Sequence, residues 1–133
     1  MKKRRLPAWE RDVLSRSGGK PMTEPSNDTA EPRNAPKRDR LPNRRASQNI
    51  AFDRDNLNFH MTVGQYPDGR TGEIFLDAEH SNSLLGVLTH DGAILASLAL
   101  QFGCPLETIR HALKRDRSGI AASPIGAALD LIP

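Results

Sequence analysis

The side chains of this sequence that could do chemistry are one thiol and four imidazoles. Cys104 lies between Gly103 and Pro105, where a helix is predicted to begin, and the positive end of a helix dipole favours a reactive thiolate. The alternative, which we favour, is that Cys104 is an unreactive small residue whose side chain fills a tight corner between helices. Cys104 is therefore a weak candidate for a reactive thiol.

The four histidines have spacings that match no compact metal-ligand motif, so we expect them on the surface. Two of them adjoin carboxylates in Glu79-His80 and His90-Asp91, but adjacent residues on a helix or strand do not face each other. The sequence therefore predicts no catalytic, cofactor-binding or metal-binding residue on this chain. The histidines are His60, His80, His90 and His111.

A tight turn is predicted at Pro67-Asp68-Gly69-Arg70, because Pro sets φ and Gly accepts a positive φ. Tyr66 and Arg70 flank this turn, and we expect them to be exposed. Tyr and Arg often anchor interfaces, which makes both residues candidate partner contacts. Equally, their types can reflect the geometry of the turn alone.

The 133 residues suffice for one small domain and a tail. Residues 1–47 hold 13 Lys/Arg and 6 Asp/Glu, whereas residues 48–133 hold 6 and 10. We interpret 1–47 as a disordered, Pro-rich basic tail, with a possible short helix at 6–14 around Trp9, a candidate partner contact. The basic runs are either solvated or make weak, salt-sensitive contact with nucleic acid.

Residues 48–133 are predicted to form an α+β domain. Three extended segments, 48–52, 57–64 and 72–77, indicate an antiparallel three-stranded meander, with the side chains at 57, 59, 61 and 63 facing the core. Three helices are expected to follow and to pack on one face of the sheet, at 83–102, 105–115 and from Ser123 onward. In the first of these helices, we expect the large apolar residues to cover the sheet: Leu84, Leu85, Val87, Leu88, Ile94, Leu95, Leu98, Ala99 and Phe102.

The chain shows no secretory signal, because its basic start is followed by Leu6-Pro7-Ala8-Trp9-Glu10 and not by an apolar run. We expect no stretch long enough to span a membrane and no membrane partner. One cysteine permits no disulfide within the chain, which agrees with a reducing compartment. We therefore expect a cytoplasmic protein.

Several short motifs occur along about the last two-thirds of the chain, at 40–42, 62–64, 66–70, 72–75 and 97–103. The same motifs occur in the same order in cobalamin-dependent ribonucleotide reductases. The chain resembles their C-terminal accessory region, the TSCPD domain, in its free-standing short form. Where the family's Thr-Ser-Cys-Pro-Asp motif would lie, this sequence has Ala121-Ala122-Ser123-Pro124-Ile125, with serine in place of the cysteine.

The resemblance implies a place in deoxyribonucleotide synthesis and DNA synthesis, beside a ribonucleoside-diphosphate reductase catalytic subunit as partner. Reducing a ribose by thiyl-radical chemistry needs a radical cysteine and a second cysteine pair, so one cysteine does not suffice. We expect an accessory or regulatory protein without the catalytic barrel, and with no cofactor on this chain, since adenosylcobalamin belongs to the catalytic relatives. The alternative function is a nucleic-acid-binding adaptor that acts through the basic tail.

Overall fold

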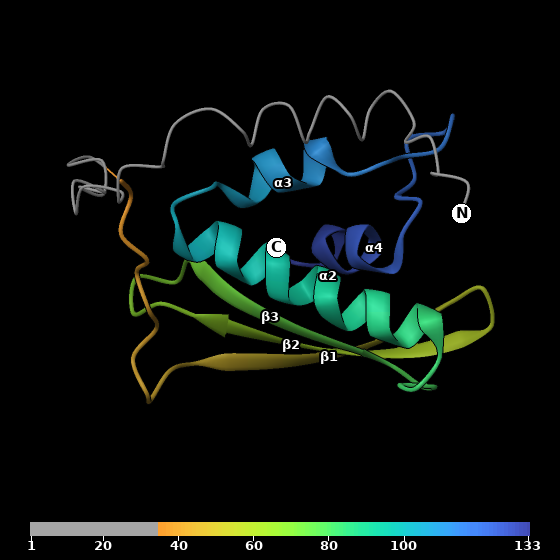
Figure 1. The fold of residues 1–133 in the computed structure, drawn as a ribbon, viewed down its shortest axis with the longest axis horizontal. Helices are drawn as coiled ribbons and strands as arrows, with labels where there is room; N and C mark the ends of the chain where they lie inside the picture. The colour runs from red at the N-terminus through yellow and green to blue at the C-terminus, as the bar shows by residue number, and fades with distance from the viewer. Residues whose placement is uncertain (1–34) are drawn as a thin grey trace, which may run out of the picture. The chain divides into compact units, whose positions relative to one another are not determined.

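The computed structural model describes residues 35–133, and the predicted helix at 6–14 with Trp9 lies outside them. In the described part, three antiparallel strands in the order β1-β2-β3 precede three helices. Figure 1 shows all three helices on one side of the sheet, so the predicted α+β architecture is confirmed. The elements are β1 (Ser47–Arg54), β2 (Leu57–Gln65), β3 (Thr71–Ala78), α2 (Leu84–Gln101), α3 (Leu106–Ala112) and α4 (Pro124–Asp130).

The register of the sheet follows from the alternation of β2 and from its two turns. Arg54 pairs with Leu57, which leaves Asp55 and Asn56 as a two-residue loop with φ of 52° and 61°. A two-residue hairpin turn of this kind needs positive φ at both positions, and Asp and Asn tolerate it best after Gly. The predicted inward face of β2 is confirmed, because Phe59, Met61 and Val63 are each 1% exposed.

The core lies between this sheet face and the helices. Ser83 begins α2, its hydroxyl accepting a hydrogen bond from the Gly86 N–H at 3.0 Å, and Gly103 follows the helix with a φ of 94°. Ser123 begins α4 in the same way, accepting from the Gly126 N–H at 3.1 Å. The core residues are Phe59, Met61, Val63, Ile74, Leu76, Ala78, Ala93, Ala96, Leu100, Ala128, Leu129 and Ile132.

The orientation that we predicted for α2 is wrong. Its buried side consists mainly of small residues, and most of the large apolar residues expected to cover the sheet are exposed. The buried residues Gly86, Thr89, Ala93 and Ala96 are small, and small side chains allow a helix to lie close to a sheet. The opposite side of α2 leaves Leu84, Leu88 and Leu95 at 75%, 60% and 67% exposure.

Two smaller predictions are also corrected. The second helix covers only Leu106–Ala112, because Leu113 turns to extended backbone (φ −75°, ψ 147°) and Arg115 then pairs with Ala121 in an isolated bridge.

By length and composition α2 could cross a membrane, contrary to our expectation that no stretch could. Core helices of globular domains also meet that criterion, and α2 packs along β3, so it is weak evidence for a membrane protein.

Part of the predicted tail belongs to the domain. The compact unit begins at Pro36, and not near residue 47. The backbone N–H of Asp39 donates to the Gln101 carbonyl at 2.8 Å, and Arg45 forms an ion pair with Glu73. Residues 36–133 contain 11 Lys/Arg and 11 Asp/Glu, so the unit carries no net charge and the acidic body that the sequence suggested disappears.

Candidate functional site

The turn between β2 and β3 forms as the sequence predicts. The Tyr66 N–H donates to the Arg70 carbonyl, and the Gly69 N–H donates to the Tyr66 carbonyl, each at 2.9 Å. Gly69 takes a φ of 90°, and Asp68 Oδ1 accepts from the Arg70 N–H at 3.0 Å. These bonds fix the direction in which the Arg70 side chain leaves the turn.

Arg70 presents a cation that is 64% exposed and held from two sides. Its Nε donates to Asp68 Oδ2 at 2.6 Å, and its guanidinium carbon lies 4.8 Å from the centre of the Tyr66 ring. The hydrogen bond from the Arg70 backbone N–H, and then that from its side chain, lower the pKa of Asp68. Arg70 is therefore a pre-oriented, partly neutralised cation at the surface.

Tyr66 is not the exposed residue that we predicted, since it is only 6% exposed. Its hydroxyl donates to the Asp39 carbonyl at 2.5 Å. A Cβ on Gly72 would lie 2.6 Å from the Tyr66 ring and 2.9 Å from Leu41, so only glycine admits both side chains. Burial, followed by the charge of Asp39, raises the pKa of Tyr66. In this structure Tyr66 positions segment 36–41.

Sequence reasoning missed Gln101, which joins three segments. It is 5% exposed, its Nε2 donates to the Gly72 carbonyl at 3.0 Å, and its Oε1 accepts from Arg38 Nε at 2.6 Å. One turn earlier, Ser97 Oγ accepts from the Ile74 N–H at 2.8 Å. The sequence feature that could have indicated Gln101 was the presence of polar side chains within an otherwise apolar helix, in the 97–103 motif. We name this cluster the Gln101 corner: Arg38, Leu41, Tyr66, Gly72 and Gln101.

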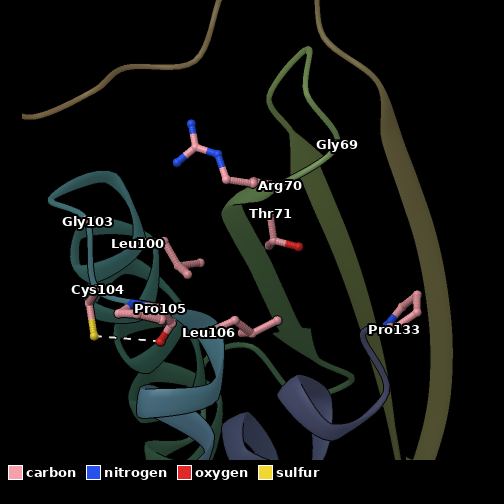
Figure 2. Close-up of a pocket in the computed structure, with 9 residues that line it drawn as sticks. All are labelled: Gly69, Arg70, Thr71, Leu100, Gly103, Cys104, Pro105, Leu106 and Pro133. Carbon is pink, nitrogen blue, oxygen red and sulfur yellow. Dashed lines mark hydrogen bonds between the residues drawn. The ribbon is translucent and has the colours of Figure 1, made fainter.

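A cavity of about 410 Å³ lies between the β2–β3 turn and the α2–α3 connection (Figure 2). Two of its lining residues, Thr71 and Leu100, precede Gly72 and Gln101 of the Gln101 corner in the sequence. It brings together two of the predicted site residues, Arg70 and Cys104, whereas Trp9 lies outside the described residues. The full lining is Gly69, Arg70, Thr71, Leu100, Gly103, Cys104, Pro105, Leu106 and Pro133.

The chemistry of this cavity suits binding better than catalysis. Within residues 35–133, Arg70 and Cys104 are the only titratable side chains in its lining, and neither is a base that could activate the thiol. The helix that follows Cys104 has seven residues, too few for a strong dipole at its start. The half-buried thiol itself lies 3.8 Å from the Pro105 carbonyl oxygen.

The histidines lie at the surface. His90 Nδ1 is 3.1 Å from Asp77 Oδ1, and His111 Nε2 is 3.8 Å from Glu107 Oε2. Within residues 35–133, no three His, Cys, Asp or Glu side chains gather closely enough to hold a metal ion.

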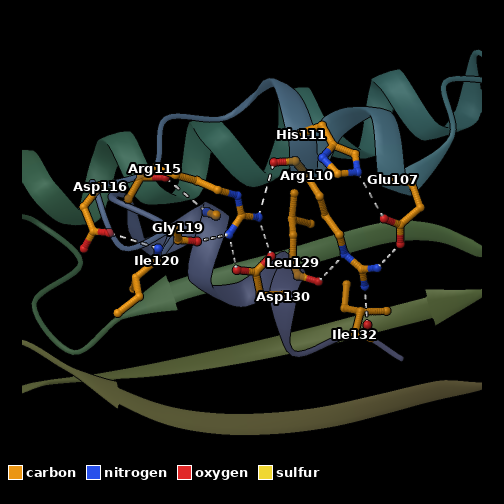
Figure 3. A network of polar contacts seen from close by, with 12 residues as sticks. Glu107, Arg110, His111, Arg115, Asp116, Gly119, Ile120, Leu129, Asp130 and Ile132 are labelled. Atoms are coloured by element: carbon orange, nitrogen blue, oxygen red, sulfur yellow. Dashed lines mark hydrogen bonds and ion pairs between the residues drawn. The ribbon is translucent and has the colours of Figure 1, made fainter.

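A polar network joins α3 to the segment around α4 (Figure 3). Arg110 Nε donates to the Leu129 carbonyl at 2.9 Å, and the same guanidinium bonds the Ile132 carbonyl and Glu107. Arg115 binds both carboxylate oxygens of Asp130, at 2.8 and 2.7 Å. This bidentate contact lowers the pKa of Asp130 and raises that of Arg115.

Comparison with known proteins gives partial matches of one kind. The chain is 35% identical over 82 residues to the vitamin B12-dependent ribonucleotide reductase of Rhodopirellula baltica, which is 62% of this chain and 8% of that protein. It is 36% identical over 70 residues to that of Agrobacterium fabrum, and 37% over 73 residues to that of Streptomyces clavuligerus. The chain carries a region related to these reductases.

The similarity covers only part of this chain and a small part of each relative. The matches cover 53–62% of this chain but only 6% and 8% of the Agrobacterium, Streptomyces and Rhodopirellula proteins. No family model matches the chain, and no solved structure matches it. The reductase-related region is therefore a small part of the relatives' length.

Proposed function

We propose that this protein is a TSCPD-domain accessory or regulatory partner of a ribonucleoside-diphosphate reductase, acting in cytoplasmic deoxyribonucleotide synthesis. The observation that carries the proposal is the 35% identity over 82 residues to 8% of a vitamin B12-dependent reductase. A region so small holds little of an enzyme that must bind a nucleotide and generate a radical. In this proposal the catalytic protein binds adenosylcobalamin and performs the chemistry.

The site supports a docking role over catalysis. Its cavity holds one thiol, from the only cysteine of the sequence, and ribose reduction needs more than one. What it offers instead is an exposed Arg70, fixed by Asp68 and stacked on Tyr66. A pre-oriented arginine loses little side-chain entropy on binding, which suits an interface anchor. Arg70 and Trp9 are the contacts that we propose.

The test is binding of the purified full-length chain to the purified reductase catalytic subunit of the same organism, by biolayer interferometry. We expect Arg70→Ala to weaken this binding at least about tenfold, as loss of an anchor does. Arg117→Ala is the matched control, because Arg117 is also exposed and lies on the 116–119 turn. Trp9→Ala tests the N-terminal contact. Absence of binding at about 100 μM, with every reductase subunit present, would reject the proposal.

The alternative function, a nucleic-acid-binding adaptor, rests on the basic runs before residue 48. Lys37, Arg40 and Arg44 are exposed, and so are Arg38 and Arg45, although these two also bond Gln101 and Glu73 within the domain. Counterion release predicts that such binding falls steeply between about 50 and 200 mM salt. Residues 36–133 should then lose nucleic-acid binding relative to the full chain, but retain binding to the reductase if docking through Arg70 is correct.

A further inference from the structure

The exposed side of α2 carries a regular apolar stripe, which we name the outer seam. Its residues are spaced by four, three, four, three and four positions, the spacing of a coiled-coil seam. Leu84, Leu88 and Leu95 are 75%, 60% and 67% exposed, and Phe102 is 45% exposed. The outer seam consists of Leu84, Leu88, Asp91, Leu95, Leu98 and Phe102.

Among the described residues, none packs over the exposed members of this seam, Leu84, Leu88, Leu95 and Phe102, whereas Leu98 is half-buried. At about 100° per residue, it lies nearly opposite the buried side of the helix, where Gly86, Thr89, Ala93, Ala96 and Leu100 face the domain. Burying the large side would have been the stronger hydrophobic choice for an isolated domain, since apolar area removed from water sets the gain. A contiguous apolar face left in water marks an interaction surface.

The positions beside the seam indicate what kind of partner it fits. On one flank lie Leu85, Gly92 and Ala99, and on the other Val87 and Ile94, so no charged residue of α2 flanks the seam; Gln101, at the next flanking position, is buried in the Gln101 corner. Charged flanking positions are what select a different helix as partner in coiled coils. Without them, the seam is complementary to another apolar seam of the same spacing, which a second copy of this chain supplies.

Asp91 decides the direction of such a pair. In a parallel pair, the two Asp91 carboxylates would face each other in the seam, and like charges in apolar surroundings are costly. In an antiparallel pair centred near Ala93, Leu84 faces Phe102, Leu88 faces Leu98, and Asp91 faces Leu95. Leu84, Leu88, Leu98 and Phe102 then meet apolar partners, each Asp91 carboxylate meets a Leu95, and the two carboxylates are offset along the axis.

We propose that two copies of this chain associate through their α2 helices, packed antiparallel along the outer seam. A cavity of about 190 Å³ beside Leu98 supports this arrangement, because it opens between α2 and β3. Its apolar lining is Ile74, Phe75, Ile94 and Leu98, and its polar lining is Arg38, Glu73, Ser97 and Gln101. In the antiparallel pair, Leu88 of the other copy faces Leu98 and points its side chain at this cavity. The Leu88 side chain fills it as a knob fills a hole.

The size of the seam sets the expected strength. The 18 residues of α2 span about 27 Å, so one helix pair buries less than the roughly 1,600 Å² of a standard interface. Association in the range of about 1–100 μM is therefore expected. Sedimentation equilibrium of the full-length chain, without detergent and from about 1 to 500 μM, measures it directly.

Three variants test the proposal. Leu88→Glu should weaken dimerisation at least about thirtyfold, because it buries a charge in each half of the interface. Ile120→Glu is the matched control, since Ile120 is 59% exposed against 60% for Leu88 but lies outside α2. It should change the dimer dissociation constant less than about threefold. Asp91→Leu removes the single charge of the seam and should tighten the dimer about tenfold or more.

Asp91→Leu separates an effect on the interface from an effect on folding, because a misfolded variant would not form a tighter specific dimer. A wild-type chain that stays monomeric at 500 μM overturns the proposal. A dimer whose dissociation constant changes with neither Leu88→Glu nor Asp91→Leu overturns it as well. A chain that is monomeric alone but binds neutral phosphatidylcholine vesicles also overturns it, and would assign the seam to a lipid surface. Tightening by Asp91→Leu together with loss by Leu88→Glu supports it.

Discussion

The side chain of Gln101, at the end of α2, donates through Nε2 to the carbonyl oxygen of Gly72, at the start of β3, at 3.0 Å. β3 is an edge strand, and its outward backbone groups would otherwise be open to another strand. Ser97 serves the same strand one helical turn earlier, where its Oγ accepts from the Ile74 N–H. The helix therefore closes the β3 edge by hydrogen bonding as well as by packing.

Replacing Gln101 with methionine should destabilise the domain by about 1–3 kcal/mol, because the buried Gly72 carbonyl loses its partner while the volume is nearly kept. Equilibrium urea unfolding of the variant and the wild type measures this difference. Gln48→Met is the matched control, since Gln48 is exposed on β1, and its effect should stay within about 0.5 kcal/mol. Equal unfolding midpoints for the two variants would contradict the role assigned to Gln101.

A substitution at Thr89 is expected to raise the stability of the domain, in contrast to the substitution at Gln101. Its Oγ1 is buried on the inner side of α2 and is the single buried side-chain oxygen or nitrogen, among the described residues, that lacks a hydrogen-bond partner. Thr89→Val removes this unsatisfied hydroxyl and keeps the shape of the side chain, so stability should rise by about 0.5–1.5 kcal/mol. Thermal unfolding followed by circular dichroism measures the change.

Thr108→Val supplies the comparison for Thr89, because Thr108 is an exposed threonine within α3. Its hydroxyl is hydrated, so the substitution should change stability by less than about 0.5 kcal/mol. A loss of stability in Thr89→Val that exceeds that in Thr108→Val would mean that the Thr89 hydroxyl is satisfied, for example by water.

The contrast between Gln101 and the leucines of α2 shows where sequence reasoning succeeds. The turn at Gly69 and the cap at Ser123 were predicted, because both residues act through bonds to residues no more than three positions away. Which side of α2 faces the sheet was not predicted, because both sides are apolar and side-chain size decides between them. A pattern that weighs hydrophobicity alone selects the leucines, although the side that packs on the domain consists mainly of small residues.

The candidate site was predictable only in part, for a related reason. Arg70 and Cys104 were singled out by type, but the cavity that they share joins residues more than 30 positions apart. The burial of Tyr66 depends on Asp39 and Leu41, in a stretch whose prolines and charges resemble a tail. Tertiary bonds to Gln101 and Tyr66, and not local propensity, order that stretch.

Tyr66 predicts a loss of stability at high pH. Burial and Asp39 raise its pKa above the ordinary value of 10.0, so the folded protein keeps this proton at a pH where the unfolded chain has lost it. The contribution of Tyr66 to stability is therefore complete below about pH 10 and is lost as the pH rises through the folded-state pKa. Since Tyr66 is the single tyrosine, absorbance at the phenolate band reports its titration alone.

Tyr66→Phe separates this effect from the titration of lysines. The variant should be less stable at pH 7 by about 1 kcal/mol, because the bond to the Asp39 carbonyl is lost. Its stability should also fall less steeply than that of the wild type as the pH is raised above 10. Parallel pH profiles for the two proteins would show that the hydroxyl ionises as freely in the folded domain as in the unfolded chain.

Asp130 predicts a loss of stability at low pH. The bidentate hydrogen bonds from Arg115 lower its pKa below the ordinary value of 3.8, so its contribution is present above about pH 4 and is lost as the pH falls through the folded-state value. The pair is partly exposed, with side chains 29% and 36% accessible, which reduces the cost of Asp130→Asn to about 0.5–1 kcal/mol at pH 7. Urea unfolding should show this difference at pH 7 and near-equality at pH 2.5, whereas Asp53→Asn, at an exposed aspartate of β1, should match the wild type at pH 7. If Asp130→Asn costs as much at pH 2.5 as at pH 7, the cause is lost packing between α3 and α4, and the ion pair with Arg115 contributes nothing.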